Sequence, residues 1–104
     1  CNKIYESEYA LAFHDIAPQA PTHVLVIPKG AYINMDDFSA HASDAEIAGF
    51  IRAVGQVARD LGVTEPGFRT LANNGPVAPQ EVPHLPVHIF AGRDLGRMIK
   101  RFDD

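Results

Sequence analysis

The alternation of hydrophobic and polar residues predicts five short strands and one long helix. Strand-like patterns occur at residues 3–7, 9–14, 22–27, 68–73 and 84–90. The helix is expected to start at the capping box Ser43-Asp44-Ala45-Glu46 and to stop at Gly62. Its apolar face is predicted to consist of Ile47, Phe50, Ile51, Val54, Val57, Ala58 and Leu61. Residues 34–39 are predicted to form a single helical turn.

This order of elements predicts an α+β fold with an antiparallel sheet. The 104 residues are expected to form a single domain, residues 1–104, and a hydrophobic content of 46% suffices for a core. No apolar run approaches the roughly 20 residues that span a bilayer, so no membrane association is expected. We also expect no leader peptide.

The net charge and the cysteine content limit which binding partners and which cellular compartment are expected. The net charge is −4 and no basic stripe is present, which argues against a nucleic-acid polymer as partner. A single nucleotide stays possible because local donors can hold it. The one cysteine, Cys1, excludes an internal disulfide framework and fits a reducing compartment. We therefore expect a cytoplasmic protein.

Candidate chemistry is concentrated in the segment His84-Leu85-Pro86-Val87-His88-Ile89-Phe90. Its period of two predicts a strand that buries the branched aliphatics and turns both histidines to the other face. Positions four apart on a strand are separated by roughly 13 Å. His84 and His88 can therefore share one small target only if another residue completes the site, and the residue between them is Pro86.

The same segment resembles the motif of the histidine triad (HIT) family, His-φ-His-φ-His-φ-φ, in which φ is apolar. It matches at every position except the middle histidine, which is Pro86 here. Residues 13–29 resemble the Hint-type (histidine-triad nucleotide-binding) branch, and the likeness covers nearly the whole chain. The resemblance implies a HIT-like α+β fold, with an antiparallel sheet of about five strands and one long packing helix.

In the family, the middle histidine attacks the α-phosphate of a nucleotide, and water then hydrolyses the covalent nucleotidyl-enzyme intermediate. Pro86 has no lone pair for that attack, and proline is also poorly placed in an inner strand. Cys1 is distant in sequence, and no serine or threonine lies on the histidine strand. We therefore predict that this chain cannot use the covalent mechanism of the family.

The resemblance assigns supporting catalytic roles to His23, His84 and His88. His23 would hydrogen-bond the triad from a neighbouring strand, His84 would orient the nucleophile, and His88 would contact a phosphate oxygen. Asp15 would accept hydrogen bonds from the ribose hydroxyls, although Asp is also a common turn residue. The remaining nucleotide-binding positions that the resemblance implies are Phe13 and Ile16 at the base and ribose, Asn73 near the phosphate, and Gln80 and Glu81 in the phosphate loop.

Several positions depart from the family pattern. Ala78 and Pro79 stand where a glycine-rich turn is usual, Glu81 where serine or threonine is common, and Tyr32 where the branch often has histidine. A short segment that helps to wall the base pocket in the family usually precedes the residue at which this sequence starts. A changed or lost ligand and an incomplete base pocket are therefore expected.

The sequence thus predicts a HIT-family protein that forms a homodimer, binds a purine nucleoside monophosphate and has little or no hydrolase activity. Two alternatives remain: an active nucleotide hydrolase or phosphoramidase with an atypical route, and a non-catalytic interaction domain that forms homodimers. A zinc site of His23, His84 and His88 is a further alternative, which the strand spacing disfavours. No cofactor is expected.

Overall fold

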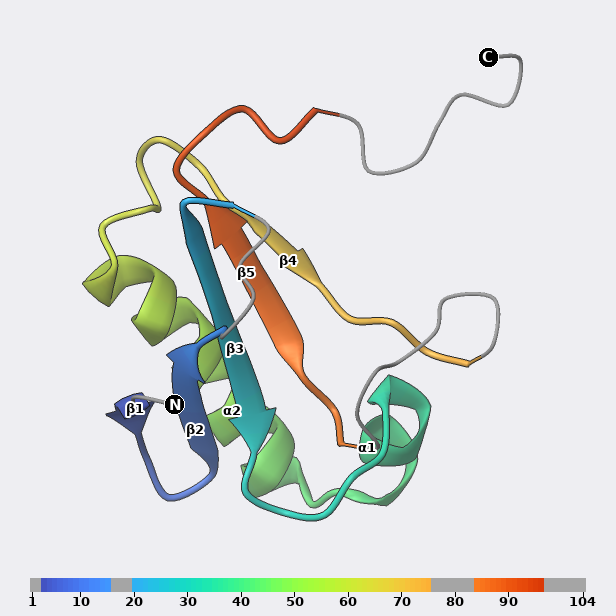
Figure 1. Ribbon diagram of the computed structural model, residues 1–104. Coiled ribbons are helices and arrows are strands. Elements are labelled where there is room, and N and C mark those ends of the chain that lie inside the picture. The colour runs from blue at the N-terminus through green and yellow to red at the C-terminus, as the bar shows by residue number, and fades with distance from the viewer. Residues whose placement is uncertain (1–2, 16–19, 76–83, 97–104) are drawn as a thin grey trace.

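A computed structural model describes residues 3–15, 20–75 and 84–96, and these contain an antiparallel five-stranded sheet and two helices (Figure 1). The strands are β1 (Lys3–Glu6), β2 (Ala10–His14), β3 (Thr22–Pro28), β4 (Arg69–Leu71) and β5 (Val87–Ala91). The helices are α1 (Met35–His41) and α2 (Asp44–Asp60). The predicted α+β fold is confirmed. Within the described part of the chain, neither helix is long and apolar enough to cross a membrane.

The strands lie in the order β1-β2-β3-β5-β4, so β5 is inserted between β3 and β4. The first three strands are joined by local connections. The β1–β2 turn is closed by Ser7, whose backbone N–H donates to the carbonyl of Ala10 at 2.9 Å. β5 pairs antiparallel with both of its neighbours. This insertion brings residues from the two ends of the chain into adjacent rows of one sheet.

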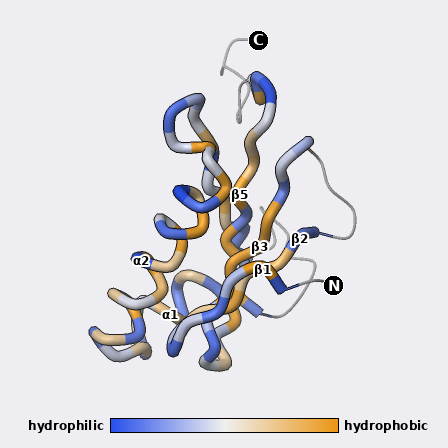
Figure 2. The backbone as a smooth tube through the Cα atoms, turned by 90° about the vertical axis from the view of Figure 1, so that its left-hand side faces the viewer, coloured by the Kyte–Doolittle hydropathy of each residue, from blue (hydrophilic) through white to orange (hydrophobic). Residues whose placement is uncertain are grey.

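Helix α2 covers one face of the sheet, and no helix among the described residues covers the other face. Figure 1 shows α2 behind β2 and β3, and Figure 2 shows the helix and the strands as two layers. The core between them contains Ala10, Ala12, Val24, Val26, Val87 and Ile89 from the sheet, with Phe50, Ala53 and Val57 from α2. Because side chains alternate along a strand, the residues between these core positions point to the opposite face. We call that face the open face.

The boundaries of α2 agree with the sequence prediction, but one residue of its apolar face does not. Ser43 Oγ accepts from the N–H of Glu46, and the Glu46 carboxylate accepts from the N–H of Ser43, which completes the capping box. Gly62 follows the helix with a φ of +72°. Ile51 was predicted to be buried but is 55% exposed. The buried face centres on Phe50, and each residue rotates the helix by about 100°, which turns Ile51 towards solvent.

The predicted strand at residues 84–90 is wrong in its first three positions. Pairing in β5 begins at Val87, opposite Val26. The N–H of Leu85 donates instead to the carbonyl of Tyr32 at 2.8 Å, in the segment that leads to α1. Pro86 is buried and lies one residue before the first paired residue of β5. A residue without a backbone N–H can occupy this position without removing a hydrogen bond between the strands. Pro86 therefore does not interrupt an inner strand.

Two other elements differ in length from the prediction. The predicted strand at 68–73 is reduced to β4, which has three residues. The predicted helical turn at 34–39 is a seven-residue helix, α1. Its N-cap is Asn34, whose side-chain oxygen accepts from the N–H of Asp37 at 2.9 Å. The cap stabilises the first turn of α1, and the length of this helix was underestimated.

Replacing each of two glycines inside α2 by alanine is expected to change the stability of the protein in opposite directions. A Cβ at Gly49 would overlap the ring of Tyr9, whereas a Cβ at Gly55 would meet only the end of the flexible Arg59 side chain, at 3.3 Å. Gly49→Ala should lower the free energy of unfolding by about 1–3 kcal/mol through overpacking. Gly55→Ala should raise it by about 0.5–1 kcal/mol because alanine is the better helix former. Urea unfolding of both variants measures the difference, and a stabilised Gly49→Ala would contradict the tight Tyr9 contact.

Candidate functional site

Strand pairing places three titratable side chains from distant parts of the chain together on the open face. His23 lies near the start of β3, and Asp15 follows β2, with its N–H donating to the carbonyl of His23 at 3.0 Å. In the β3–β5 ladder, His23 is opposite Phe90 and Leu25 is opposite His88. Side chains of directly opposed residues point to the same face. Asp15, His23, His88 and Phe90 therefore project from one side of the sheet.

The three titratable groups converge on one atom of His23. Its Nε2 lies 2.9 Å from Nδ1 of His88 and 3.2 Å from Oδ2 of Asp15. One ligand atom from each residue lies within 4.8 Å of the others. His23 is only 3% exposed, and the Asp15 side chain is 19% exposed. We call these residues the Asp15–His23–His88 cluster. The predicted hydrogen bond from His23 to the histidine motif is confirmed, and its partner is His88.

Phe90 fixes the two imidazoles and was not singled out from the sequence. Its ring centroid lies 4.2 Å from that of His23 and 5.6 Å from that of His88, and the His88 and Phe90 rings are almost parallel, at 4°. Such packing restricts ring rotation and so holds the ligand atoms in place. The alternation of side chains along this strand could have identified Phe90, because it places Phe90 on the same face as His88.

Burial sets the protonation state of His23. Removal from water penalises the imidazolium and lowers the pKa of His23 below 6.5, and the Asp15 carboxylate opposes this shift only partly. His23 is therefore mainly neutral at pH 7. A neutral imidazole has one N–H donor and one nitrogen lone pair. Nε2 of His23 can therefore either donate to Asp15 or His88, or accept from Nδ1 of His88.

His84 does not join this cluster. Its Nε2 lies 3.1 Å from the carbonyl oxygen of Pro28, at the opposite end of β3 from His23. The alternative zinc site of His23, His84 and His88 is therefore wrong in one of its residues. Within the described residues, the group whose possible ligand atoms lie close together contains Asp15 in place of His84. His84 and His88 therefore lie at different places on the sheet, as their spacing suggested.

The other predicted site residues are only partly placed by the structure. Phe13 is half-buried opposite Leu25, on the open face. Asn73 is half-buried beyond β4, and the following residue, Asn74, accepts from the N–H of Met35 at 2.8 Å. Tyr32 donates its hydroxyl to the Glu46 carboxylate. The remaining positions, Ile16, Ala78, Pro79, Gln80 and Glu81, lie outside the described residues.

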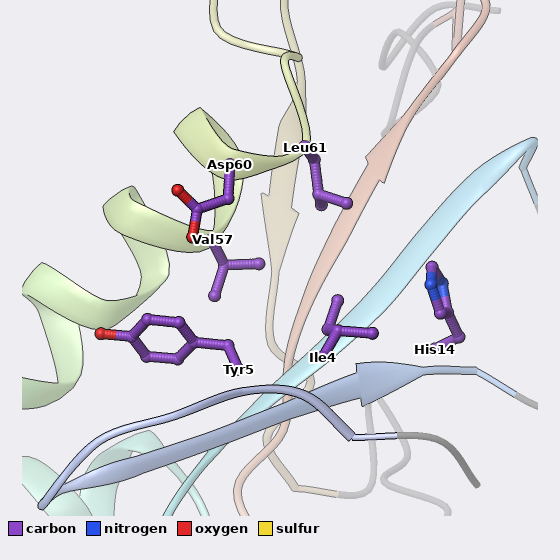
Figure 3. Close-up of a pocket in the computed structure, with 6 residues that line it drawn as sticks. All are labelled: Ile4, Tyr5, His14, Val57, Asp60 and Leu61. Atoms are coloured by element: carbon purple, nitrogen blue, oxygen red, sulfur yellow. The ribbon is translucent and has the colours of Figure 1, made fainter.

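A separate pocket lies on the helix side of the sheet, between the β1–β2 hairpin and the end of α2 (Figure 3). Its lining residues are Ile4, Tyr5, His14, Val57, Asp60 and Leu61. No member of the Asp15–His23–His88 cluster is among them. His14 and the cluster therefore belong to opposite faces, and this pocket does not serve the chemistry described above.

Comparison with known proteins gives consistent matches across most of the chain. A family model described as HIT domain matches residues 1–95. An uncharacterized 13.2 kDa HIT-like protein of Azospirillum brasilense is 67% identical over 101 residues, covering 97% of this chain and 83% of that protein. Purine nucleoside phosphoramidase of Escherichia coli K12 is 36% identical over 96 residues, covering 92% and 80%. The structure of a HIT family hydrolase from Clostridium thermocellum superimposes with a TM-score of 0.82 at 39% identity, covering 95% and 85%.

Proposed function

This chain belongs to the HIT domain family, and from that membership we propose that it is a Hint-type protein that binds a purine nucleoside monophosphate without the covalent hydrolysis step. Its similarity to a purine nucleoside phosphoramidase supports a nucleotide as the ligand class. We place it in the cytoplasm as a homodimer. The exposed side chains of Ile51 on α2 and Phe68 beside the edge strand β4 offer apolar surface for such contacts.

The observation that carries this proposal is the Asp15–His23–His88 cluster on the open face. A carboxylate can accept from both hydroxyls of a ribose, because each of its two oxygens can accept more than one hydrogen bond. The imidazole of His88 lies within about 5 Å of that carboxylate and can donate to a phosphate oxygen. Half-buried apolar side chains on the same face, which include Phe13 and Leu25, provide surface for the nucleoside.

The loss of covalent chemistry follows from Pro86. We assign this residue to the nucleophile position because it lies between two histidines of the motif. Its nitrogen belongs to the backbone amide and cannot attack phosphorus. Pro86 is also buried. Binding and turnover are thereby separated in this chain: the ribose and phosphate contacts are kept, and the attacking group is missing.

Calorimetric titration with AMP in EDTA-containing buffer tests the binding half of the proposal. We expect saturable binding by the wild-type chain, and an affinity about tenfold or more lower for Asp15→Ala, because a hydrogen bond to a charged group contributes about 1.5–3 kcal/mol. His41→Gln is the matched control, since His41 is exposed on α1 and pairs with Asp37.

The ligand itself supplies a second control. Removing the ribose 2′-hydroxyl should weaken binding to the wild-type chain and change little for Asp15→Ala, whose carboxylate is already gone. Thermal melts without ligand establish that each variant is folded. Absence of heat and of any thermal shift with millimolar AMP would refute the proposal.

A further inference from the structure

We propose that Asn74 is a site of spontaneous deamidation, and that the modification releases the segment after β4 (residues 72–75) from α1. Asn74 precedes Gly75, and both residues are exposed. The side-chain oxygen of Asn74 accepts from the backbone N–H of Met35, the first residue of α1, at 2.8 Å. The proposed nucleotide function requires neither this contact nor the reaction, so the inference goes beyond it.

The Asn74 side chain acts as an external cap for α1. The first N–H groups of a helix have no partner within the helix. Asn34 accepts from the N–H of Asp37, and Asn74 accepts from the N–H of Met35. The Asn74 amide also donates to the carbonyl of Ala72 at 3.3 Å. This one side chain therefore joins the segment after β4 to a helix that starts 39 positions earlier in the sequence.

The same segment contains asparagine followed by glycine, the dipeptide in which deamidation is easiest. Gly75 has a φ of +75°, a conformation that glycine adopts without the steric cost that a Cβ imposes. Apart from its chain neighbours, no atom of the described residues lies within 4 Å of the place that a Cβ would occupy. The turn therefore favours glycine here, and glycine shields its own backbone nitrogen less than any other residue would.

The reaction needs only the chain and water. The Gly75 backbone nitrogen loses its proton and attacks Cγ of Asn74, which closes a succinimide ring. The bond from Cγ to Nδ2 breaks, and Nδ2 leaves as ammonia. Water then opens the ring at either carbonyl carbon. Breaking the bond to Cγ gives aspartate, whereas breaking the bond to the backbone carbonyl carbon gives isoaspartate, in which the main chain is one methylene longer.

The hydrogen bonds of the Asn74 amide control both the rate and the consequence of this reaction. An amide held by Met35 and Ala72 cannot turn towards the Gly75 nitrogen, so the reaction proceeds when these contacts open. Both products lose the donor to Ala72, because a carboxylate only accepts. In isoaspartate the longer main chain also displaces the carboxylate from Met35. Formation of isoaspartate therefore frees the Met35 N–H and breaks the link to α1.

Peptide mapping by mass spectrometry, on the nucleotide-free chain aged in mildly alkaline buffer, tests the inference. The described residues include three asparagines, Asn34, Asn73 and Asn74, and only the last is followed by glycine. We expect Asn74 to convert, mainly to isoaspartate, while Asn34 and Asn73 stay intact in the same samples. Asn74→Gln should leave position 74 unmodified, because the larger ring that glutamine would have to form closes slowly.

Two substitutions of Met35 test whether the contact with α1 controls the rate. Met35→Pro removes the N–H that holds Asn74, and proline is well tolerated at the first position of a helix. Met35→Ala removes the same side chain and keeps the N–H. Met35→Pro should deamidate about 2–10-fold faster than Met35→Ala, which is the effect expected from one hydrogen bond. Circular dichroism establishes that both variants keep their helices.

Hydrogen exchange measures the structural consequence. The Met35 N–H should exchange faster in the isoaspartate form than in the unmodified protein, and the N–H of Asp37, which Asn34 caps, should change less. Equal conversion of Asn74 and Asn73 overturns the inference, as do equal rates for Met35→Pro and Met35→Ala. Unchanged exchange of the Met35 N–H after modification overturns it as well. None of these measurements uses a nucleotide, so their outcome is independent of the AMP titration.

Discussion

Replacing Pro86 by histidine is expected to give the chain phosphoramidase activity, which the proposed function predicts to be absent from the wild type. Loss of a catalytic nucleophile reduces kcat by on the order of 10³–10⁶ in enzymes where it has been removed. Pro86→His should therefore raise the hydrolysis of adenosine 5′-phosphoramidate by about 10³-fold or more. The imidazole would supply the lone pair that attacks phosphorus, the P–N bond would break and ammonia would leave, and water would then release AMP from the covalent intermediate.

The position of Pro86 makes this substitution compatible with the fold. Ladder pairing starts at Val87, one residue later, so a regained backbone N–H at position 86 displaces no existing hydrogen bond of the sheet. The neighbouring segment is already held by the bond from Leu85 to Tyr32. The substitution therefore changes the chemistry at this point and keeps the path of the chain.

Pro86→Ala is the matched control for this experiment. It makes the same backbone change, removes the ring and adds no imidazole, so it should stay inactive. Adding Asp15→Ala to Pro86→His should reduce the new activity by weakening the ribose contact. A wild-type chain that already turns over the phosphoramidate, or a folded and inactive Pro86→His, would refute the assignment of Pro86 to the nucleophile position. Mass spectrometry of quenched reactions should detect the nucleotidylated variant.

Phe50→Ala is expected to cost about 3–5 kcal/mol in the free energy of unfolding, the range for buried phenylalanine. Phe50 is fully buried and lies between α2 and the sheet. Its ring also packs edge-on against Phe38 of α1, with centroids 5.3 Å apart. The substitution removes this contact and leaves a cavity where α1, α2 and the sheet meet. Urea unfolding at 25 °C measures the loss.

The next residue, Ile51, provides the control for this prediction. It is 55% exposed, so Ile51→Ala should change the free energy of unfolding by no more than about 0.5 kcal/mol. The two substituted residues are adjacent in α2, but Phe50 lies on the buried face of the helix and Ile51 on the exposed face. Similar losses for Phe50→Ala and Ile51→Ala would contradict the orientation of α2 described here.

The long helix and the order of elements along the chain were predictable because their signals are local. Ser43, Glu46 and Gly62 mark the ends of α2 within a few residues, and the structure contains both caps. The β-prone run at 22–27 became β3, extended by one residue to Pro28. The error at Ile51 arose because spacing alone defines a broad apolar stripe. Packing against the sheet selects the part of that stripe that is buried.

The geometry of the cluster was less accessible from the sequence. Family resemblance pointed to Asp15, His23 and His88 individually, while local spacing placed His84 and His88 on one strand. That Asp15 and not His84 meets His88 depends on the β2–β3–β5 register and on the diversion of Leu85 towards Tyr32. Both are long-range contacts, and no short window of sequence encodes them.

The insertion of β5 between β3 and β4 also has a consequence for the order in which the molecule assembles. The β1–β2–β3 meander can form as soon as its residues are available, whereas His88 meets His23 across a sequence separation of 65 positions. Closing such a long loop costs entropy before any contact is gained, which slows folding. The meander can therefore form early, and the cluster is complete only when the last strand has entered the sheet.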